Sequence, residues 1–212
     1  MVDLVSPSGP TATEGSDMQD LTEGVARFRR DVFPAKAELF AHLATTHRPS
    51  TLFIGCSDAR VVPELITGSE PGELFVIRTA GNLVPAYAPG IDGIAASIEY
   101  AVAALGVSDI VICGHSACGA MTALAESHDM GALPTTADWL RHADAARART
   151  TTAGVDALVR GNVRAQLANL VTHPSVARAL TRGTVALHGW CYDIGSGAVE
   201  QLDVVDPFAA AA

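Results

Sequence analysis

The stretch that decides the fold is Val111-Ile112-Cys113-Gly114-His115-Ser116-Ala117-Cys118-Gly119, an apolar run that ends in a glycine and is followed by a histidine and a cysteine. The β-branched Val111 and Ile112 favour extended backbone, and Gly114 marks a sharp turn of the chain. His115 and Cys118 are therefore predicted to lie at or just beyond the carboxyl end of a strand. If a helix begins there, their i and i+3 spacing places both side chains on one helix face.

Histidine and cysteine together are ligand types that zinc prefers. Zinc binds imidazole nitrogen at about 2.0–2.1 Å and thiolate sulfur at about 2.3 Å, and residues spaced as His115 and Cys118 are can satisfy both. Two ligands do not make a site, so a third must come from elsewhere in the chain. The alternative is a buried core cysteine beside a hydrogen-bonded histidine, which is the commoner origin of an isolated His-x-x-Cys pair. A second stretch decides between the two.

That second stretch is Thr51-Leu52-Phe53-Ile54-Gly55-Cys56, a short apolar run bounded by Pro49 and by the polar residues Ser57-Asp58-Ala59-Arg60. Unbroken apolar runs of this length are typical of strands buried on both faces. In open α/β sheets, ligands bind beyond the carboxyl ends of the strands. If the two strands are neighbours, Cys56, His115 and Cys118 converge as a Cys2His set with one coordination position open, an arrangement typical of catalytic zinc.

Asp58 and Arg60 follow the first predicted ligand directly. A guanidinium can hold a carboxylate with two parallel hydrogen bonds and fix its direction, so this pair is predicted to support the metal centre. The alternative is a solvated surface ion pair that contributes about 0–1 kcal/mol. The neighbouring Cys56 favours the first interpretation.

The remaining elements follow from periodicity and turn residues. Strands are predicted at residues 74–77 and 185–192, and, after a turn at residues 193–197, an edge strand at residues 199–205. Helices are predicted at residues 91–105 and 121–125, with three more between residues 137 and 180. The predicted fold class is therefore α/β, with a mainly parallel sheet of about four strands plus an antiparallel edge strand, flanked by helices.

Three parts of the chain differ in pattern. Residues 1–19, rich in Pro, Gly, Ser and Thr, are predicted to be a disordered tail. Residues 20–48 carry two helical patterns separated by Pro34 and are predicted to form an N-terminal helical arm. Residues 49–212 are predicted to form a single zinc-binding α/β catalytic domain. The arm has an apolar stripe that needs a surface to cover, either its own sheet or a second copy of the chain: Leu21, Val25, Phe28 and Val32.

Composition excludes several classes of function. The 212 residues, of which 49% are hydrophobic, suffice for one well-buried domain. The net charge of -9 argues against nucleic acid as a partner, because phosphate binding relies on clustered Lys and Arg. No apolar run approaches the ~20 residues of a membrane-spanning helix, and no basic region precedes an apolar one at the N-terminus. We therefore expect a cytoplasmic protein without membrane attachment, whose four widely spaced cysteines serve metal binding or burial.

The two motifs, Cys56-Ser57-Asp58-Ala59-Arg60 and Gly114-His115-Ser116-Ala117-Cys118-Gly119, together resemble the β-class carbonic anhydrase family, and the resemblance extends from about residue 49 to residue 202. It implies the reversible hydration of CO2 to bicarbonate and a proton by zinc-bound hydroxide. It also implies one Zn2+ per chain, held by Cys56, His115 and Cys118. Asp58 and Arg60 are implied to be the catalytic dyad beside the metal.

The resemblance extends to the substrate pocket and to assembly. The backbone amide of Gly119 is implied to orient the substrate, and Phe75 and Tyr100 to line the CO2 pocket from the other subunit. The expected assembly is thus a homodimer or a higher homo-oligomer, with CO2 and bicarbonate as its ligands. His47 stands where many members of the family have a substrate-contacting glutamine. Phe53 stands where some bacterial members have the tryptophan of an inhibitory bicarbonate site.

Two other functions fit the same fold and metal. One is the hydrolysis of carbonyl sulfide or carbon disulfide, which relatives in this family also perform. The other is a zinc-bound regulatory protein without turnover. Rates with CO2 and with carbonyl sulfide, measured with and without a chelator, separate the three.

Overall fold

The structure is a computed structural model that describes residues 16–150 and 154–203. The chain divides into two compact units, the first ending at His47 and the second beginning at Arg48. The second unit contains all the strands of the described residues, and it carries both sequence motifs. The three-part division expected from the sequence, with boundaries at residues 19 and 48, remains a prediction.

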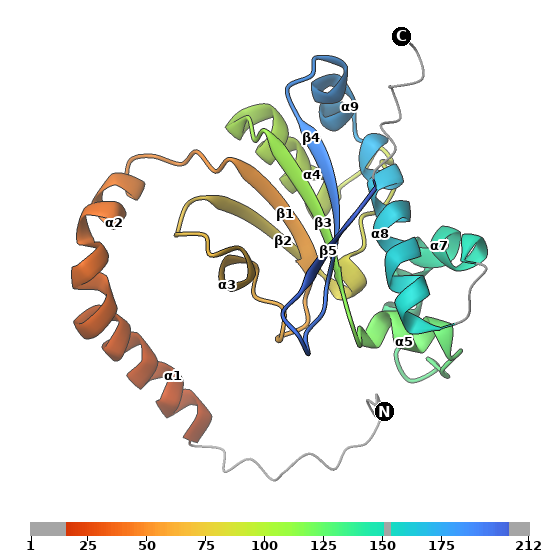
Figure 1. The fold of residues 1–212 in the computed structure, drawn as a ribbon, viewed down its shortest axis with the longest axis horizontal. Helices are drawn as coiled ribbons and strands as arrows, with labels where there is room; N and C mark the ends of the chain where they lie inside the picture. The colour runs from red at the N-terminus through yellow and green to blue at the C-terminus, as the bar shows by residue number, and fades with distance from the viewer. Residues whose placement is uncertain (1–15, 151–153, 204–212) are drawn as a thin grey trace. The chain divides into compact units, whose positions relative to one another are not determined.

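A single sheet forms the centre of the second unit, with strand order β2-β1-β3-β4-β5 among the described residues (Figure 1). Its strands are β1 (Thr51–Cys56), β2 (Leu74–Thr79), β3 (Asp109–His115), β4 (Ala186–Tyr192) and β5 (Val199–Leu202). The pairs β1 with β2, β1 with β3 and β3 with β4 are parallel, whereas β5 pairs antiparallel with β4. The predicted fold class is confirmed.

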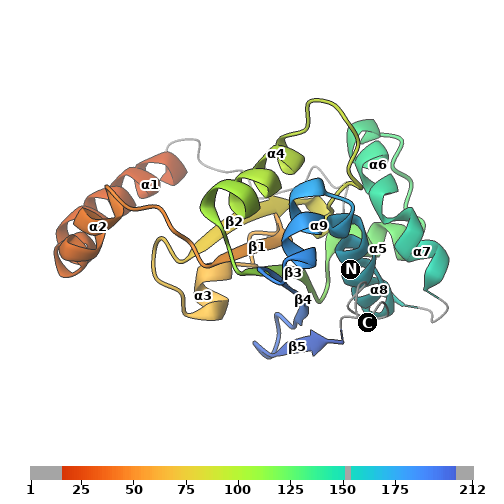
Figure 2. The same cartoon turned by 90° about the horizontal axis from the view of Figure 1, so that it is seen from above.

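The two faces of the sheet follow from the alternation of side chains along its strands. Leu52, Ile54, Ile110 and Ile112 point to one face, in a core shared with α4 (Gly93–Glu99), η4 (Tyr100–Leu105), α8 (Val155–Val171) and α9 (Pro174–Thr181). Figure 2 shows α4, α8 and α9 on this face. The intervening residues Phe53, Val111 and Cys113 form a smaller cluster on the other face.

Glycines let α8 approach the middle of the sheet closely. A Cβ atom added to Gly114 in β3 would lie 2.9 Å from Val159 Cγ1 and 2.9 Å from Val163 Cγ2. In β4, a Cβ atom on Gly189 would lie 3.0 Å from Leu167 Cδ1. Real Cβ atoms essentially never approach carbon as closely as at Gly114, and the contact at Gly189 is tighter than most, so glycine at both positions lets the helix pack where it does without a shift of its neighbours. α8 therefore lies directly against the strand that ends at His115.

The helices between the strands are more divided than the sequence pattern predicts. Two of the three helices predicted between residues 137 and 180 are α8 and α9, and the rest of that region holds α6 (Pro134–Leu140), η5 (Arg141–Ala143) and α7 (Asp144–Arg149). The helix predicted at residues 91–105 begins at Gly93 because Asp92 caps it, and its second half is the π-helix η4. Three shorter elements complete the second unit: α3 (Pro63–Thr67), η3 (Ala80–Asn82) and α5 (Gly119–Ala125).

The first unit is helical, as predicted for the arm. It contains α1 (Ser16–Arg27), η1 (Phe28–Val32), η2 (Phe33–Lys36) and α2 (Ala37–Leu43), and Pro34 lies in η2 at the change of direction. Phe33 and Phe40 stack with ring centroids 5.3 Å apart. α1 begins at Ser16, so residues 16–19 of the predicted tail are helical, and residues 1–15 lie outside the described residues. Within the described part of the chain, every helix is too short or too polar to cross a membrane.

Candidate metal centre and active site

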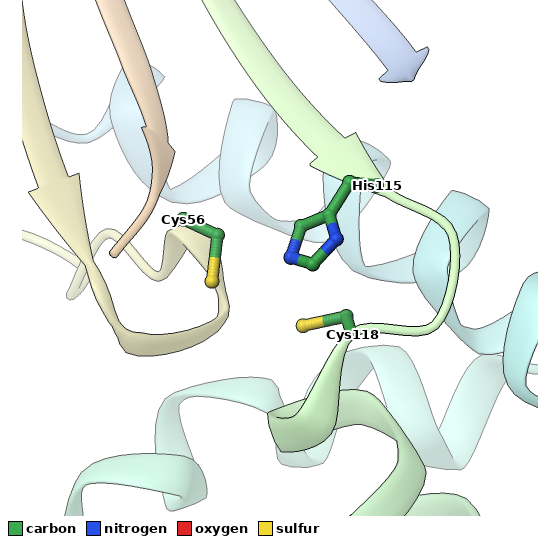
Figure 3. A group of neighbouring side chains, drawn as sticks. All are labelled: Cys56, His115 and Cys118. Atoms are coloured by element: carbon green, nitrogen blue, oxygen red, sulfur yellow. The ribbon is translucent and has the colours of Figure 1, made fainter. Parts of the chain in front are cut away.

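Three potential metal ligands meet at the carboxyl edge of the sheet (Figure 3). Cys56 is the last residue of β1 and His115 the last of β3, and these strands are parallel neighbours. Cys118 follows three residues later as the N-cap of α5. The two sulfur atoms and the imidazole nitrogen lie within 4.8 Å of one another, and all three residues are buried. The convergence expected from the sequence is therefore present.

His115 offers a free nitrogen to this group. Its ring is fully buried, and Nδ1 lies 2.9 Å from the carbonyl oxygen of Ser116, to which it donates its hydrogen. Nε2 is then the unprotonated nitrogen, and it has no hydrogen-bond partner among the described residues. A buried polar atom without a partner is costly, and a metal ion is what such a nitrogen binds.

Cys56 and Cys118 shift each other's pKa in opposite directions. The Cys118 thiol donates to the Cys56 sulfur, which lowers the pKa of Cys56 to about 4, and the same contact raises the pKa of Cys118. The backbone N–H of Gly81 also donates to Cys56 Sγ, at 3.4 Å. Ala117, in the turn between His115 and Cys118, has a left-handed φ of 51° that brings Cys118 back toward His115. A negative sulfur pair beside a free imidazole nitrogen is a donor set that suits zinc.

Asp58 and Arg60 lie beside the three ligands. Arg60 Nε donates to Asp58 Oδ1 at 2.9 Å and Nη2 donates to Oδ2 at 2.7 Å, while the Arg60 backbone N–H donates to Oδ1 at 3.0 Å. Asp58 Oδ2 is 3.8 Å from His115 Nε2, so the carboxylate faces the ligand group. The Arg60 hydrogen bonds hold the pKa of Asp58 well below its usual range. Arg60 Nη2 also donates to the carbonyl oxygen of Ala117, at 3.1 Å.

Comparisons with known proteins agree with this geometry. The family model described as carbonic anhydrase matches residues 51–199. The chain is 58% identical over 193 residues to the carbonic anhydrase of Pseudomonas aeruginosa, covering 88% of each chain. It is 56% identical over 193 residues to carbonic anhydrase 1 of Escherichia coli O157:H7, again covering 88% of each. Among solved structures, the β-carbonic anhydrase CcaA superimposes with a TM-score of 0.85 at 43% identity, covering 89% of each chain.

The chain belongs to the β-class carbonic anhydrases. Its reaction is the reversible hydration of CO2 to bicarbonate and a proton, and its cofactor is zinc. The Cys56, His115 and Cys118 group fits that cofactor, because it pairs two sulfur atoms with a buried imidazole nitrogen that has no hydrogen-bond partner in the described part of the chain.

One residue of this carbonic anhydrase site was missed by sequence reasoning. Arg78, in β2, donates from Nε to the carbonyl oxygen of Cys56 at 3.0 Å and from Nη2 to the carbonyl oxygen of Asp58 at 2.6 Å. It therefore holds the backbone that carries both a metal ligand and the carboxylate. A usable signal was present, since an arginine near the end of an otherwise apolar parallel strand needs a polar partner at that edge.

The residues expected in the substrate pocket are placed differently. Gly119 is the first residue of α5 and follows Cys118 directly, so its backbone lies beside a metal ligand. Phe75 and Tyr100 lie together, with ring centroids 6.1 Å apart. Phe75 pairs with Leu52, however, which is four residues before Cys56 and so about 13 Å from it along the strand. His47 is exposed at the end of the first unit. Within the second unit, Gly119 is next to the ligands, whereas Phe75 and its neighbour Tyr100 are not.

Proposed function

We propose that this β-carbonic anhydrase hydrates CO2 at the centre formed by Cys56, His115 and Cys118, with Asp58 as the group that orients the attacking oxygen. The observation that carries the assignment of Asp58 is its position: Oδ2 lies 3.8 Å from His115 Nε2 while Arg60 holds both carboxylate oxygens. Zinc in this centre lowers the pKa of a coordinated water from about 15.7 toward about 7 and so supplies hydroxide near neutral pH.

The environment of Asp58 suits its carboxylate to accept a hydrogen bond. Because its pKa is lowered, it is ionised at neutral pH and can only accept hydrogen bonds. A carboxylate that only accepts fixes the direction of an O–H group beside the metal and leaves the oxygen lone pair aimed at carbon. Arg60 uses two of its donors to keep the carboxylate in this orientation.

The remaining pocket residues are proposed to act on the substrate. Gly119 lies at the start of α5, where backbone N–H groups have no partner within the helix, so its amide can donate to a substrate oxygen. Phe75 and Tyr100 are proposed to line the pocket of a neighbouring subunit, since the strand register keeps Phe75 about 13 Å from the metal ligands of its own chain. His47 is proposed to contact the substrate in place of glutamine.

The assembly is proposed to be a homodimer or a larger homo-oligomer in the cytoplasm. α1 exposes large apolar side chains, with Met18 72%, Leu21 67% and Val25 61% exposed, and such a stripe is typical of a covered surface. Two β-carbonic anhydrases from Sordaria macrospora, with 31% identity and a TM-score of 0.71, are described as tetrameric. Free rather than paired cysteines are consistent with a reducing compartment.

The role of Asp58 predicts a loss of turnover without loss of metal. Asp58→Asn removes the negative charge that orients the attacking oxygen, and we expect kcat for CO2 hydration to fall roughly 10- to 100-fold while zinc content stays at one per chain. Stopped-flow CO2 hydration with metal analysis of the same sample measures both.

The matched control is Asp109→Asn. Asp109 also has a histidine partner, with Oδ1 2.8 Å from His188 Nε2, but it begins β3 whereas His115 ends that strand. This variant should retain wild-type turnover. Undiminished turnover in Asp58→Asn, or an equal loss in both variants, contradicts the assignment. Assaying carbonyl sulfide in parallel identifies the alternative substrate if the wild-type chain prefers it.

A further inference from the structure

α8 carries three amide side chains where a core helix would ordinarily carry apolar ones. Asn162, Gln166 and Asn169 are spaced four and three residues apart, so they lie on one face of the helix. Asn162 and Gln166 are fully buried. Burying an amide is costly unless its hydrogen bonds are made inside the protein, so each of these side chains must have partners. We call the three residues the amide ladder.

The amide ladder bonds to backbone groups of residues 81–84, which follow β2, and Gln166 Nε2 also donates to the carbonyl oxygen of His142 at 3.2 Å. Asn162 Nδ2 donates to the carbonyl oxygen of Gly81, and Gln166 Oε1 accepts from the N–H of Val84, both at 2.9 Å. Asn169 Nδ2 donates to the carbonyl oxygen of Val84 at 2.9 Å. The segment is buried and belongs to no strand, so these side chains satisfy backbone groups that a sheet would otherwise pair.

The ladder is also connected within itself. Gln166 Nε2 donates to Asn162 Oδ1 at 2.9 Å, and Asn169 Nδ2 lies 3.3 Å from Gln166 Oε1. Each amide therefore fixes the orientation of the next along the helix. A buried network in which the members orient one another is rigid, because a change at one position leaves the others without their partners.

Gly81 connects the ladder to the metal centre. Its carbonyl oxygen is held by Asn162, and its N–H donates to Cys56 Sγ at 3.4 Å. Its φ of 74° is a conformation that other residues rarely adopt, and an added Cβ atom would lie 3.1 Å from Ala120 Cβ and 3.2 Å from Met121 Cε. Gly81 thus has a restricted backbone conformation. α8 holds its carbonyl group, and Trp139 Nε1 donates at 2.9 Å to the carbonyl oxygen of Ala80, which shares a peptide plane with the Gly81 N–H.

We propose that the amide ladder of Asn162, Gln166 and Asn169 positions the metal centre by holding Gly81 so that its N–H donates to the sulfur of Cys56. The three amides are positioning residues, because they act through Gly81 and touch neither metal nor substrate. An N–H donor facing a thiolate stabilises its charge and fixes the direction of its lone pairs, which sets how the sulfur binds the metal. This inference rests on the proposed function, since it requires Cys56 to be a metal ligand.

The test measures the metal rather than turnover. Asn162→Ala removes the hydrogen bond to Gly81, and Gln166→Met removes the acceptor for Val84 with little change in side-chain volume. In both variants we expect the rate of zinc transfer to a chromogenic chelator to be at least roughly ten-fold higher than in wild type. The rate is measured well below the melting temperature of each variant. In the cobalt-substituted protein, we expect the thiolate-to-cobalt absorption band to shift in the same variants. Asn169→Leu, three hydrogen bonds away from Gly81 along the ladder, should show a smaller effect and serves as the test if the other two variants fail to fold.

The control separates positioning from stability. Leu170→Ala changes the same helix at a fully buried apolar position that makes no side-chain hydrogen bond to residues 81–84. It should lower the melting temperature while leaving the zinc release rate and the cobalt spectrum at wild-type values.

Two results overturn the inference: wild-type release rates and spectra in the ladder variants, or an equal change in Leu170→Ala. A wild-type chain that takes up neither zinc nor cobalt contradicts the proposed function together with this inference. A wild-type chain that binds the metal while the ladder variants match it contradicts this inference alone.

Discussion

The four cysteines of this chain divide into two chemical kinds. Cys56 and Cys118 face each other at the carboxyl edge of the sheet, and their contact lowers the pKa of Cys56 to about 4. Burial instead raises the pKa of Cys113 to about 12 and that of Cys191 to about 11. The same contact raises the pKa of Cys118, so the pair carries its negative charge on Cys56, whereas burial keeps the Cys113 and Cys191 thiols neutral. Environment, and not residue type, therefore separates metal ligands from core cysteines.

The raised pKa of Cys113 predicts a loss of stability in alkaline solution. An unfolded cysteine titrates near 8.5, so below that pH both states hold the proton and the full stability is present. Above it the unfolded chain releases a proton that the native chain keeps, and the free energy of unfolding falls by up to ~1.4 kcal/mol per pH unit until the pH reaches about 12. Denaturant titrations under reducing conditions at pH 8, 9 and 10 should show this slope.

Cys113→Ala is the matching variant, because it removes the titrating thiol from the same buried position. Its unfolding free energy should be lower throughout but should fall less steeply above pH 8.5. Identical slopes in the variant and in wild type would show that Cys113 does not titrate in this way.

The residues of the site differ in how far sequence could predict them. Cys56, His115 and Cys118 were accessible, because two apolar runs end at them and parallel strands bring such ends together. Asn162, Gln166 and Asn169 were not, because amides in a helical pattern look like a solvated face until the segment at residues 81–84 is placed against them. A helical pattern predicts which residues share one face of a helix, but it does not predict which loop packs against that face.

The contact between β3 and α8 links the sheet to the helix that supports the site. α8 packs against β3 over Gly114, the residue before His115, and its Asn162 bonds to the carbonyl oxygen of Gly81. The strand positions were predicted closely because their apolar runs are bounded by turn residues. The helices were predicted less closely, since the division of residues 134–149 into α6, η5 and α7 depends on how neighbouring helices pack.

Gly114→Ala tests this contact. The new methyl group would lie 2.9 Å from side-chain carbons of Val159 and Val163, so either α8 or β3 must shift. We expect the free energy of unfolding to fall by about 1–3 kcal/mol, as for other insertions into packed cores. Denaturant unfolding measures the change.

Gly93→Ala is the control, because a Cβ atom there meets nothing within 4 Å. It should be neutral, or stabilising by up to ~1 kcal/mol. If Gly114→Ala proves as harmless as Gly93→Ala, the close packing of α8 on β3 is not a source of stability.

For the whole molecule, the open question is where Phe75 and Tyr100 act. They lie together but away from the metal ligands of their own chain, so a role in the reaction requires a neighbouring subunit. Sequence reasoning could name these residues only by resemblance to the family.

Shared pockets predict complementation between two inactive chains. A Cys118→Ser chain lacks a metal ligand but keeps Phe75, and a Phe75→Arg chain keeps its metal ligands but blocks the pocket of its neighbour. In an equal mixture that exchanges subunits, half of the dimers are mixed and each has one intact pocket, so activity should return to about a quarter of the wild-type value. CO2 hydration before and after mixing measures the recovery.

Two controls accompany the mixture. Each variant assayed alone should stay inactive, and light scattering should show dimers or larger assemblies at assay concentration. A monomer under these conditions, or no recovery in mixtures shown to exchange subunits, would rule out a pocket formed by two chains.

The central claim is that Cys56, His115 and Cys118 hold the catalytic zinc, and X-ray absorption at the zinc edge tests it most directly. The wild-type protein should contain one zinc per chain with two sulfur neighbours at about 2.3 Å and a nitrogen neighbour at about 2.0–2.1 Å. In Cys118→Ser, any zinc that remains should have one sulfur neighbour, and CO2 hydration should be lost. A zinc without sulfur neighbours in wild type, or an unchanged two-sulfur shell with full turnover in Cys118→Ser, would contradict the claim.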